Sequence, residues 1–92
     1  MEPVTTITVD VPNSDSHLEI HEAVGFKTSQ ADFYLCPLLG RKRWLGYTEA
    51  DERYCPFSCG DYQLTWLEEG VQVDYKFDPG TDSWAQAVFT WN

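Results

Sequence analysis

The sequence predicts a mainly β domain, a small antiparallel β-sandwich or partly open barrel with a C-terminal three-stranded meander and at most one short helix. Three observations predict it. Apolar and polar residues alternate on both sides of a turn at 61–77, and they alternate again at 5–11. A third run, at 85–91, can pair with the second strand of the 61–77 hairpin. With 92 residues, the chain has room for a single domain, 1–92.

Residues 61–77, DYQLTWLEEGVQVDYKF, form the clearest unit, a β-hairpin. We expect a four-residue loop at 67–70 in which Gly70 supplies a left-handed conformation. One face of the hairpin is then apolar and aromatic and the other is polar, so a one-residue slip would disrupt both. The apolar pairs are Trp66 with Val71, Leu64 with Val73, and Tyr62 with Tyr75; the polar pairs are Thr65 with Gln72, Gln63 with Asp74, and Asp61 with Lys76.

A Pro79-Gly80 turn leads into the last strand. We expect Phe77 to pair with Ala85, which places large residues opposite small ones at one end of the meander. In this register Trp84 lies on the face opposite Ala85 and is exposed. The remaining expected pairs are Tyr75 with Ala87, Val73 with Phe89, and Val71 with Trp91.

The N-terminal part begins with a strand at 5–11, followed by turn residues up to Ser16. Residues 16–26 fit two structures. As a helix, they would begin with a Ser16–Glu19 capping box and end at Gly25; as a strand, Leu18 and Ile20 would lie opposite Val11 and Val9. We favour the strand, because a segment of about nine residues is short for a helix.

The middle of the chain has weaker patterns. We expect a linker at 26–32, a strand at 32–39 and a return strand at 41–47, in which Trp44 and Tyr47 lie on opposite faces. Residues 48–60 break the β pattern, and we expect a short helical turn capped by Thr48 before irregular backbone around Pro56 and Gly60. Long loops often bind partners, which makes this segment a candidate.

Charge is the most informative functional feature. The chain has 15 acidic and 6 basic residues, a net charge of -9, which argues against direct binding to nucleic acid or anionic lipid. Residues 1–40 and 61–92 each carry -5 and the middle carries +1, which sums to -9. We therefore expect a partner with a basic surface. The predicted contact residues are acidic: Glu49, Asp51, Glu52, Asp61, Glu68, Glu69 and Asp74.

The metal-ligating residue types are His17, His21, Cys36, Cys55 and Cys59. His17 and His21 could share a metal only on a helix, because on a strand they lie about 13 Å apart. We predict no metal ligand, no cofactor and no catalytic residue, because no nucleophile or phosphate-loop motif is present. Three cysteines without a signal peptide fit reduced thiols in the cytoplasm, and no apolar run is long enough for a membrane span.

These observations favour a stoichiometric inhibitor over an enzyme. It would block a basic surface on a nuclease, a nucleic-acid-binding complex or a toxin by acidic mimicry, as phage anti-CRISPR proteins or immunity proteins do. The first alternative is a ligand- or carbohydrate-binding module that uses exposed aromatic residues, with candidates Trp44, Tyr47, Trp84 and Trp91. The second alternative is a zinc-stabilised interaction domain.

Overall fold

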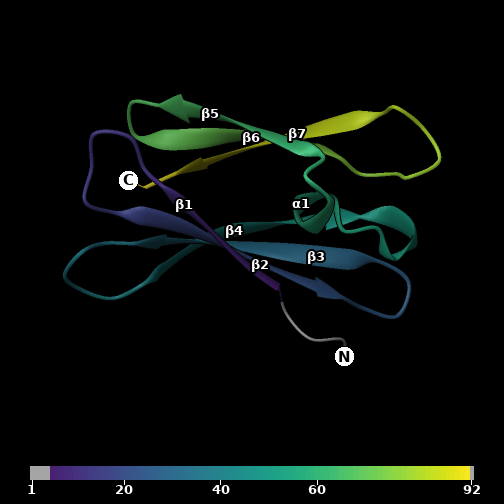
Figure 1. Ribbon diagram of the computed structural model, residues 1–92, viewed down its shortest axis with the longest axis horizontal. Helices are drawn as coiled ribbons and strands as arrows, with labels where there is room; N and C mark the ends of the chain where they lie inside the picture. Colours follow the sequence, from purple (N-terminus) through teal and green to yellow (C-terminus); the bar gives the residue numbers. More distant parts are fainter. Residues whose placement is uncertain (1–4, 92) are drawn as a thin grey trace.

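Two antiparallel sheets face each other in a computed structural model that describes residues 5–91 (Figure 1). The strand orders are β1-β2-β3-β4 and β5-β6-β7, with the short helix α1 between the two layers. The mainly β prediction, with its C-terminal meander and one short helix, is confirmed. The elements are β1 Thr5–Asp10, β2 His17–Val24, β3 Ser29–Cys36, β4 Arg43–Ala50, the 3-10 turn η1 Asp51–Arg53, α1 Pro56–Cys59, β5 Tyr62–Leu67, β6 Gly70–Lys76 and β7 Trp84–Thr90.

The hairpin of β5 and β6 has the predicted register, with Trp66 opposite Val71 and Leu64 opposite Val73. The predicted role of Gly70 was wrong. Gly70 is not among the left-handed glycines; it pairs with Leu67, so the turn contains only Glu68 and Glu69. Glycine is required there because a Cβ would lie 2.4 Å from the backbone oxygen of Phe89.

Strand β7 pairs two residues away from the predicted register. Val71 lies opposite Phe89, Val73 opposite Ala87 and Tyr75 opposite Ala85. A two-residue shift keeps every side chain on its predicted face, and Trp84 is 48% exposed as expected. The observed register lets the Phe89 ring stack on Phe33, with ring centroids 4.6 Å apart.

Residues 17–24 form a strand, as favoured by the sequence. The register with β1 also differs by two residues from the expected one, with Val9 opposite Leu18 and Ile7 opposite Ile20. The difference arises because the turn is tighter than expected: Val11 N donates a hydrogen bond to Ser16 O at 3.2 Å, so the turn contains residues 12–15.

Three boundaries in the middle of the chain were wrong. The predicted linker extended to residue 32, but β3 begins at Ser29, which is buried. Thr48 lies inside β4 and is buried, so the expected helical turn does not form there. Pro56 begins α1 where irregular backbone was expected, because proline is favoured in a first helical turn, and Gly60 ends it with φ of 80°.

A β-bulge interrupts the pairing of β3 and β4. Phe33 lies opposite Gly46 and Tyr34 opposite Trp44, which leaves Leu45 without a cross-strand partner. The extra residue reverses the alternation, so Trp44 and Tyr47 lie on one face instead of the two predicted faces. Gly46 has φ of 152°, and a Cβ there would lie 2.6 Å from the Phe89 ring.

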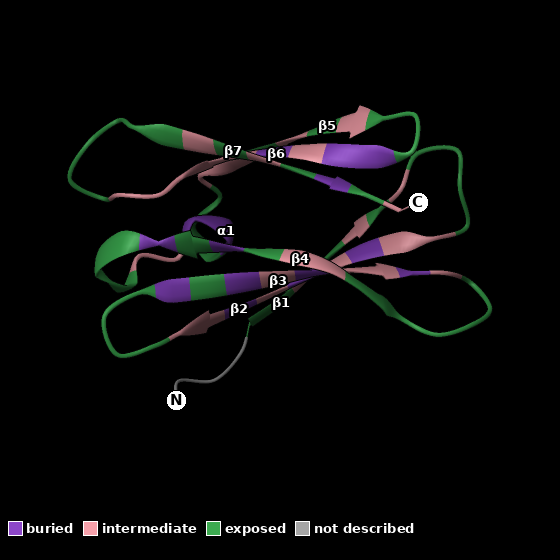
Figure 2. Ribbon diagram, turned by 180° about the vertical axis from the view of Figure 1, so that it is seen from behind, coloured by how far each residue is buried: buried purple, intermediate pink, exposed green. Residues whose placement is uncertain are grey.

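The core lies between the sheets, where the buried strand segments face each other (Figure 2). It includes a buried carboxylate: Glu22 accepts hydrogen bonds from the backbone N–H groups of Phe57 at 3.0 Å and Ser58 at 2.7 Å, and from the Ser58 hydroxyl at 2.5 Å. These bonds attach α1 to β2. The apolar core residues are Leu18, Ile20, Ala31, Phe33, Phe57, Val71, Val73 and Phe89.

Candidate functional site

The outer face of the four-stranded sheet carries the unusual side chains of this protein. It is the face that points away from β5–β7, and no described element covers it in Figure 1. Its residues alternate with core residues such as Leu18, Ile20 and Phe33. By register, the outer face contains Thr6, Thr8, Asp10, His17, Glu19, His21, Gln30, Asp32, Tyr34, Cys36, Trp44, Tyr47 and Glu49.

Two exposed aromatic rings lie on β4. Trp44 and Tyr47 are 54% and 50% exposed, and their rings are 6.4 Å apart and nearly parallel, at 17°. Trp44 Nε1 donates a hydrogen bond to Asp32 Oδ1 at 3.1 Å, and Tyr47 lies opposite Asp32. Glu49 follows on the same face, opposite Gln30. We call Asp32, Trp44, Tyr47 and Glu49 the aromatic–acidic patch.

A shallow hollow of about 350 Å³ adjoins the aromatic–acidic patch. Asp32 belongs both to the patch and to the lining of the hollow. The rings of His21 and Tyr34 pack against each other in the hollow at 4.6 Å, and Lys42 Nζ lies 5.4 Å from the Tyr34 ring centre. The lining residues are His21, Ala23, Val24, Gly25, Thr28, Gln30, Asp32 and Tyr34. The outer face therefore offers a concave surface beside a flat aromatic one.

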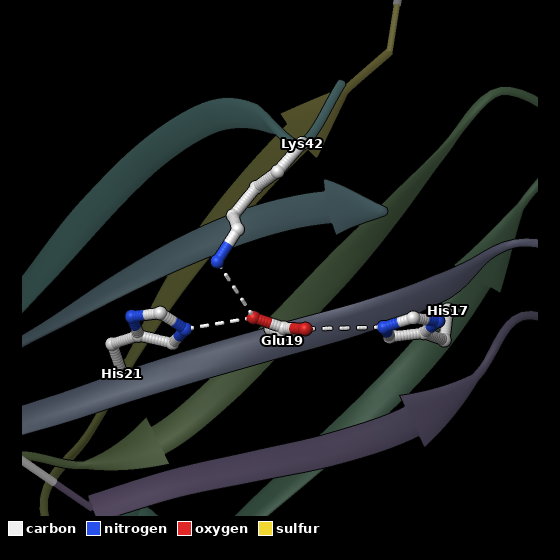
Figure 3. A network of polar contacts seen from close by, with 4 residues as sticks. All are labelled: His17, Glu19, His21 and Lys42. Atoms are coloured by element: carbon white, nitrogen blue, oxygen red, sulfur yellow. Dashed lines mark hydrogen bonds and ion pairs between the residues drawn. The ribbon is translucent and has the colours of Figure 1, made fainter. Parts of the chain in front are cut away.

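A polar cluster lies on the same outer face, along β2, with Glu19 at its centre (Figure 3). Its Oε2 is 3.1 Å from His17 Nε2, and its Oε1 is 2.9 Å from His21 Nε2 and 3.3 Å from Lys42 Nζ. Hydrogen bonds from His21 and then from His17 lower the pKa of Glu19 from 4.5 to about 2. The carboxylate is thus ionised and held in one orientation.

Cys36 completes the cluster. Cys36 lies on β3, directly opposite His17 of β2, and is buried. Burial, and after it the hydrogen bond and charge of Glu19, raise the pKa of the Cys36 thiol. Ligand atoms of His17, Glu19 and Cys36 all lie within 4.8 Å of one another. The cluster therefore brings an imidazole, a carboxylate and a thiol to one point.

This grouping differs from the one that the sequence suggested. On the observed strand, His17 and His21 contact Glu19 from opposite sides instead of facing each other as on a helix. Cys55 is the N-cap of α1 and Cys59 is its last residue, and all three thiols are free. The alternation His-x-Glu-x-His was a readable signal for the strand face, but the approach of Cys36 depends on the register of β2 with β3.

The predicted acidic contact residues do not gather in one place. Glu68 and Glu69 form the β5–β6 turn, at the end of the sandwich where Trp91 N donates to Glu69 O at 3.1 Å. At the other end, Asp51 N donates to Phe77 O at 2.7 Å, and the exposed carboxylates of Glu49, Asp51 and Glu52 lie there.

The remaining two predicted residues have partners in the structure. Asp74 lies on the outer face of the three-stranded sheet, where its carboxylate accepts hydrogen bonds from Gln72 and Gln86, each at 3.2 Å. The carboxylate of Asp61 accepts a hydrogen bond from the Tyr54 hydroxyl. Of the seven residues, only Glu49 belongs to the aromatic–acidic patch.

A cleft of about 540 Å³ opens between the two sheets near the Glu68 turn. Leu35, Trp66 and Trp91 supply apolar surface, while Ser14, Ser16 and Glu68 supply polar groups. The cleft separates the β1–β2 connection from the β5–β6 turn.

Comparison with known proteins finds no matching family model, no similar curated protein and no similar solved structure. No helix in residues 5–91 is long and apolar enough to span a membrane.

Proposed function

We propose that this protein binds a basic surface of another protein and thereby blocks it, and that the aromatic–acidic patch makes the contact. The observation that carries the proposal is the exposed, stacked pair of Trp44 and Tyr47 beside the carboxylates of Asp32 and Glu49. Arginine and lysine bind to aromatic faces by cation–π attraction and to carboxylates by charge-assisted hydrogen bonds. The patch offers both kinds of contact to one cationic side chain.

The exposure of the two rings supports a protein partner. Tryptophan and tyrosine are enriched among the residues that dominate binding energy at protein interfaces. Phe26, which is 89% exposed, lies in the turn beside the hollow and extends the available apolar surface. The net charge of -9 would accelerate the encounter with a basic partner at low salt.

Two matched tryptophan variants test the proposal with an arginine-rich peptide as the probe. Trp44 and Trp84 are similarly exposed, but they lie on the outer faces of different sheets. We expect Trp44→Ala to weaken peptide binding by about tenfold, as for a residue that dominates an interface. Trp84→Ala should bind as wild type does. Equal losses in both variants, or none in Trp44→Ala, would contradict the proposal.

Salt and peptide charge provide the controls. Affinity for the arginine-rich peptide should fall as salt rises from about 0.05 to 0.5 M, because exposed charges are screened. An acidic peptide of the same length should not bind. Binding that is independent of salt would exclude the acidic contribution and leave only an aromatic contact.

A carbohydrate is the second candidate ligand for the same patch. The near-parallel rings of Trp44 and Tyr47 form a platform on which a sugar ring could stack, and the carboxylate of Asp32 could accept its hydroxyl hydrogens. A panel of neutral oligosaccharides, followed by tryptophan fluorescence, distinguishes the two. Saturable binding of a sugar that Trp44→Ala abolishes would favour the carbohydrate.

A further inference from the structure

We propose that His17, Glu19 and Cys36 form a binding site for a divalent transition metal, with zinc as the best match. Their ligand atoms are an imidazole nitrogen, a carboxylate oxygen and a thiol sulfur, all within 4.8 Å of one another. The site lies on the outer face, apart from the aromatic–acidic patch, and it does not depend on the proposed function.

The β-sheet frame places these ligands. His17 and Glu19 are two residues apart on β2, so both side chains point to the same face. Cys36 lies directly opposite His17 on the hydrogen-bonded neighbour β3. Ligands from two paired strands keep their relative positions without a metal, so metal binding would order only the side chains.

The distances suit a tetrahedral ion. Zinc bonds of about 2.0–2.3 Å at tetrahedral angles separate neighbouring ligand atoms by about 3.3–3.7 Å. In the structure, His17 Nε2 and Glu19 Oε2 are 3.1 Å apart and the whole set lies within 4.8 Å. Small side-chain rotations are therefore enough to enclose an ion.

The carboxylate already has outer partners of the kind found at metal sites. His21 and Lys42 contact Oε1 of Glu19, while Oε2 points toward His17 (Figure 3). Ligating carboxylates are commonly oriented by such second contacts. His21 is accordingly a positioning residue, because it binds the oxygen that does not face the metal.

The ligand set selects the metal. Calcium and magnesium prefer oxygen ligands, whereas imidazole and thiolate suit zinc and similar transition metals. On binding, the Cys36 thiol releases its proton to solvent and its sulfur bonds to the ion as thiolate. Within the described residues these three are the ligand atoms that gather here, so water would complete the coordination of the ion.

Cobalt(II) binding tests the site in the full chain, purified and kept under reducing conditions. We expect one equivalent of Co²⁺ to give a sulfur-to-cobalt charge-transfer absorption and visible bands of tetrahedral cobalt, both reversed by one equivalent of Zn²⁺. Cys36→Ser should remove the charge-transfer band. Cys59→Ser, which changes an exposed thiol outside the cluster, should leave it unchanged.

Two further variants give graded results. His17→Gln should lose metal binding, and His21→Ala should weaken it by about 10- to 100-fold, as is typical of outer partners. Circular dichroism in a chelator checks that each variant folds; if Cys36→Ser does not fold, His17→Gln, which changes a partly exposed side chain, carries the test. Absence of a cobalt spectrum in wild type, or a charge-transfer band that survives Cys36→Ser or His17→Gln, would overturn the proposal.

Discussion

The two sheets share one core but have different outer faces. The three-stranded sheet presents a regular outer face without a bulge, which is mostly polar, as at Thr65, Gln72 and Gln86. It also carries the separate exposed apolar side chains of Trp84 and Val88. The four-stranded sheet presents a bulge, a stacked aromatic pair, a hollow and the Glu19 cluster. The irregular sheet is therefore where we place both proposed sites.

The difference has a local physical cause. A regular antiparallel ladder points every second residue to solvent, so its outer face follows from the sequence. A bulge changes the direction of a side chain, and here it brings Trp44 and Tyr47 together. Bulges are often found beside functional sites, which is consistent with the proposal for the aromatic–acidic patch.

The largest loss of stability is expected at Gly46, where the β-bulge meets the core. Gly46→Val places a branched side chain at φ of 152° and against the Phe89 ring. Strain and overpacking together should lower the free energy of unfolding by about 3 kcal/mol. Chemical denaturation measures this, with Gly80→Ala in an exposed turn as the control; equal stability of both variants would show that the close approach to Phe89 is not required.

The buried carboxylate should give the next largest effect. Glu22→Gln keeps the shape of the side chain but places an amide group against the N–H donors of Phe57 and Ser58. We expect a loss of about 2 kcal/mol in stability, because a buried hydrogen-bonding group is left unsatisfied. Glu68→Gln on the exposed turn is the matched control, and a similar loss there would contradict this assignment.

Glu19 should make the stability of the protein depend on pH in the acid range. Its pKa is lowered from 4.5 to about 2 in the folded state, so its contribution is complete above about pH 4.5 and is lost as pH falls toward 2. In a chelator, Glu19→Gln should be less stable than wild type by about 1–2 kcal/mol at pH 7. The difference should shrink below pH 4.5; a constant difference down to pH 2 would refute the proposed cause.

Asp74→Asn supplies the corresponding control on the other sheet. Within residues 5–91, its carboxylate is hydrogen-bonded to the neutral amides of Gln72 and Gln86, so the substitution should cost less than about 0.5 kcal/mol. A larger loss than that of Glu19→Gln would reverse the comparison between the two faces.

Charge reversals at the surface should change stability least and binding most selectively. Glu49→Lys, in the aromatic–acidic patch, should weaken binding of the arginine-rich peptide, because it places like charges together. Glu68→Lys and Asp74→Lys should retain binding if the patch is the contact surface. Loss of binding only in the Glu68→Lys and Asp74→Lys variants would favour the acidic surface of the β5–β6 hairpin, which the sequence suggested, over the patch.

Much of the fold could be predicted from the sequence because alternation reports burial directly. The β5–β6 register and the exposure of Trp84 followed from that pattern. Two registers, β1 with β2 and β6 with β7, were displaced by two residues, because a shift of two preserves the faces and only loop geometry and core packing distinguish the alternatives.

The candidate sites were less accessible to sequence reasoning. The predicted acidic residues lie at both ends of the sandwich and on the outer face of the three-stranded sheet, whereas the aromatic–acidic patch depends on the bulge at Leu45. His17 and Glu19 can be placed together once β2 is read as a strand. Their approach to Cys36 cannot be predicted from the sequence, because it requires the register with which β2 pairs with β3.

By itself, the sequence determined the β class, the polar and apolar faces of the meander and the acidity of the surface, because these depend on composition and on a period of two residues. Only the tertiary structure decided that Glu22 would bind α1, that Gly46 and Gly70 would approach Phe89, and that Cys36 would approach His17 and Glu19. Most of these contacts join residues distant in the chain, so they depend on how the sheets pack.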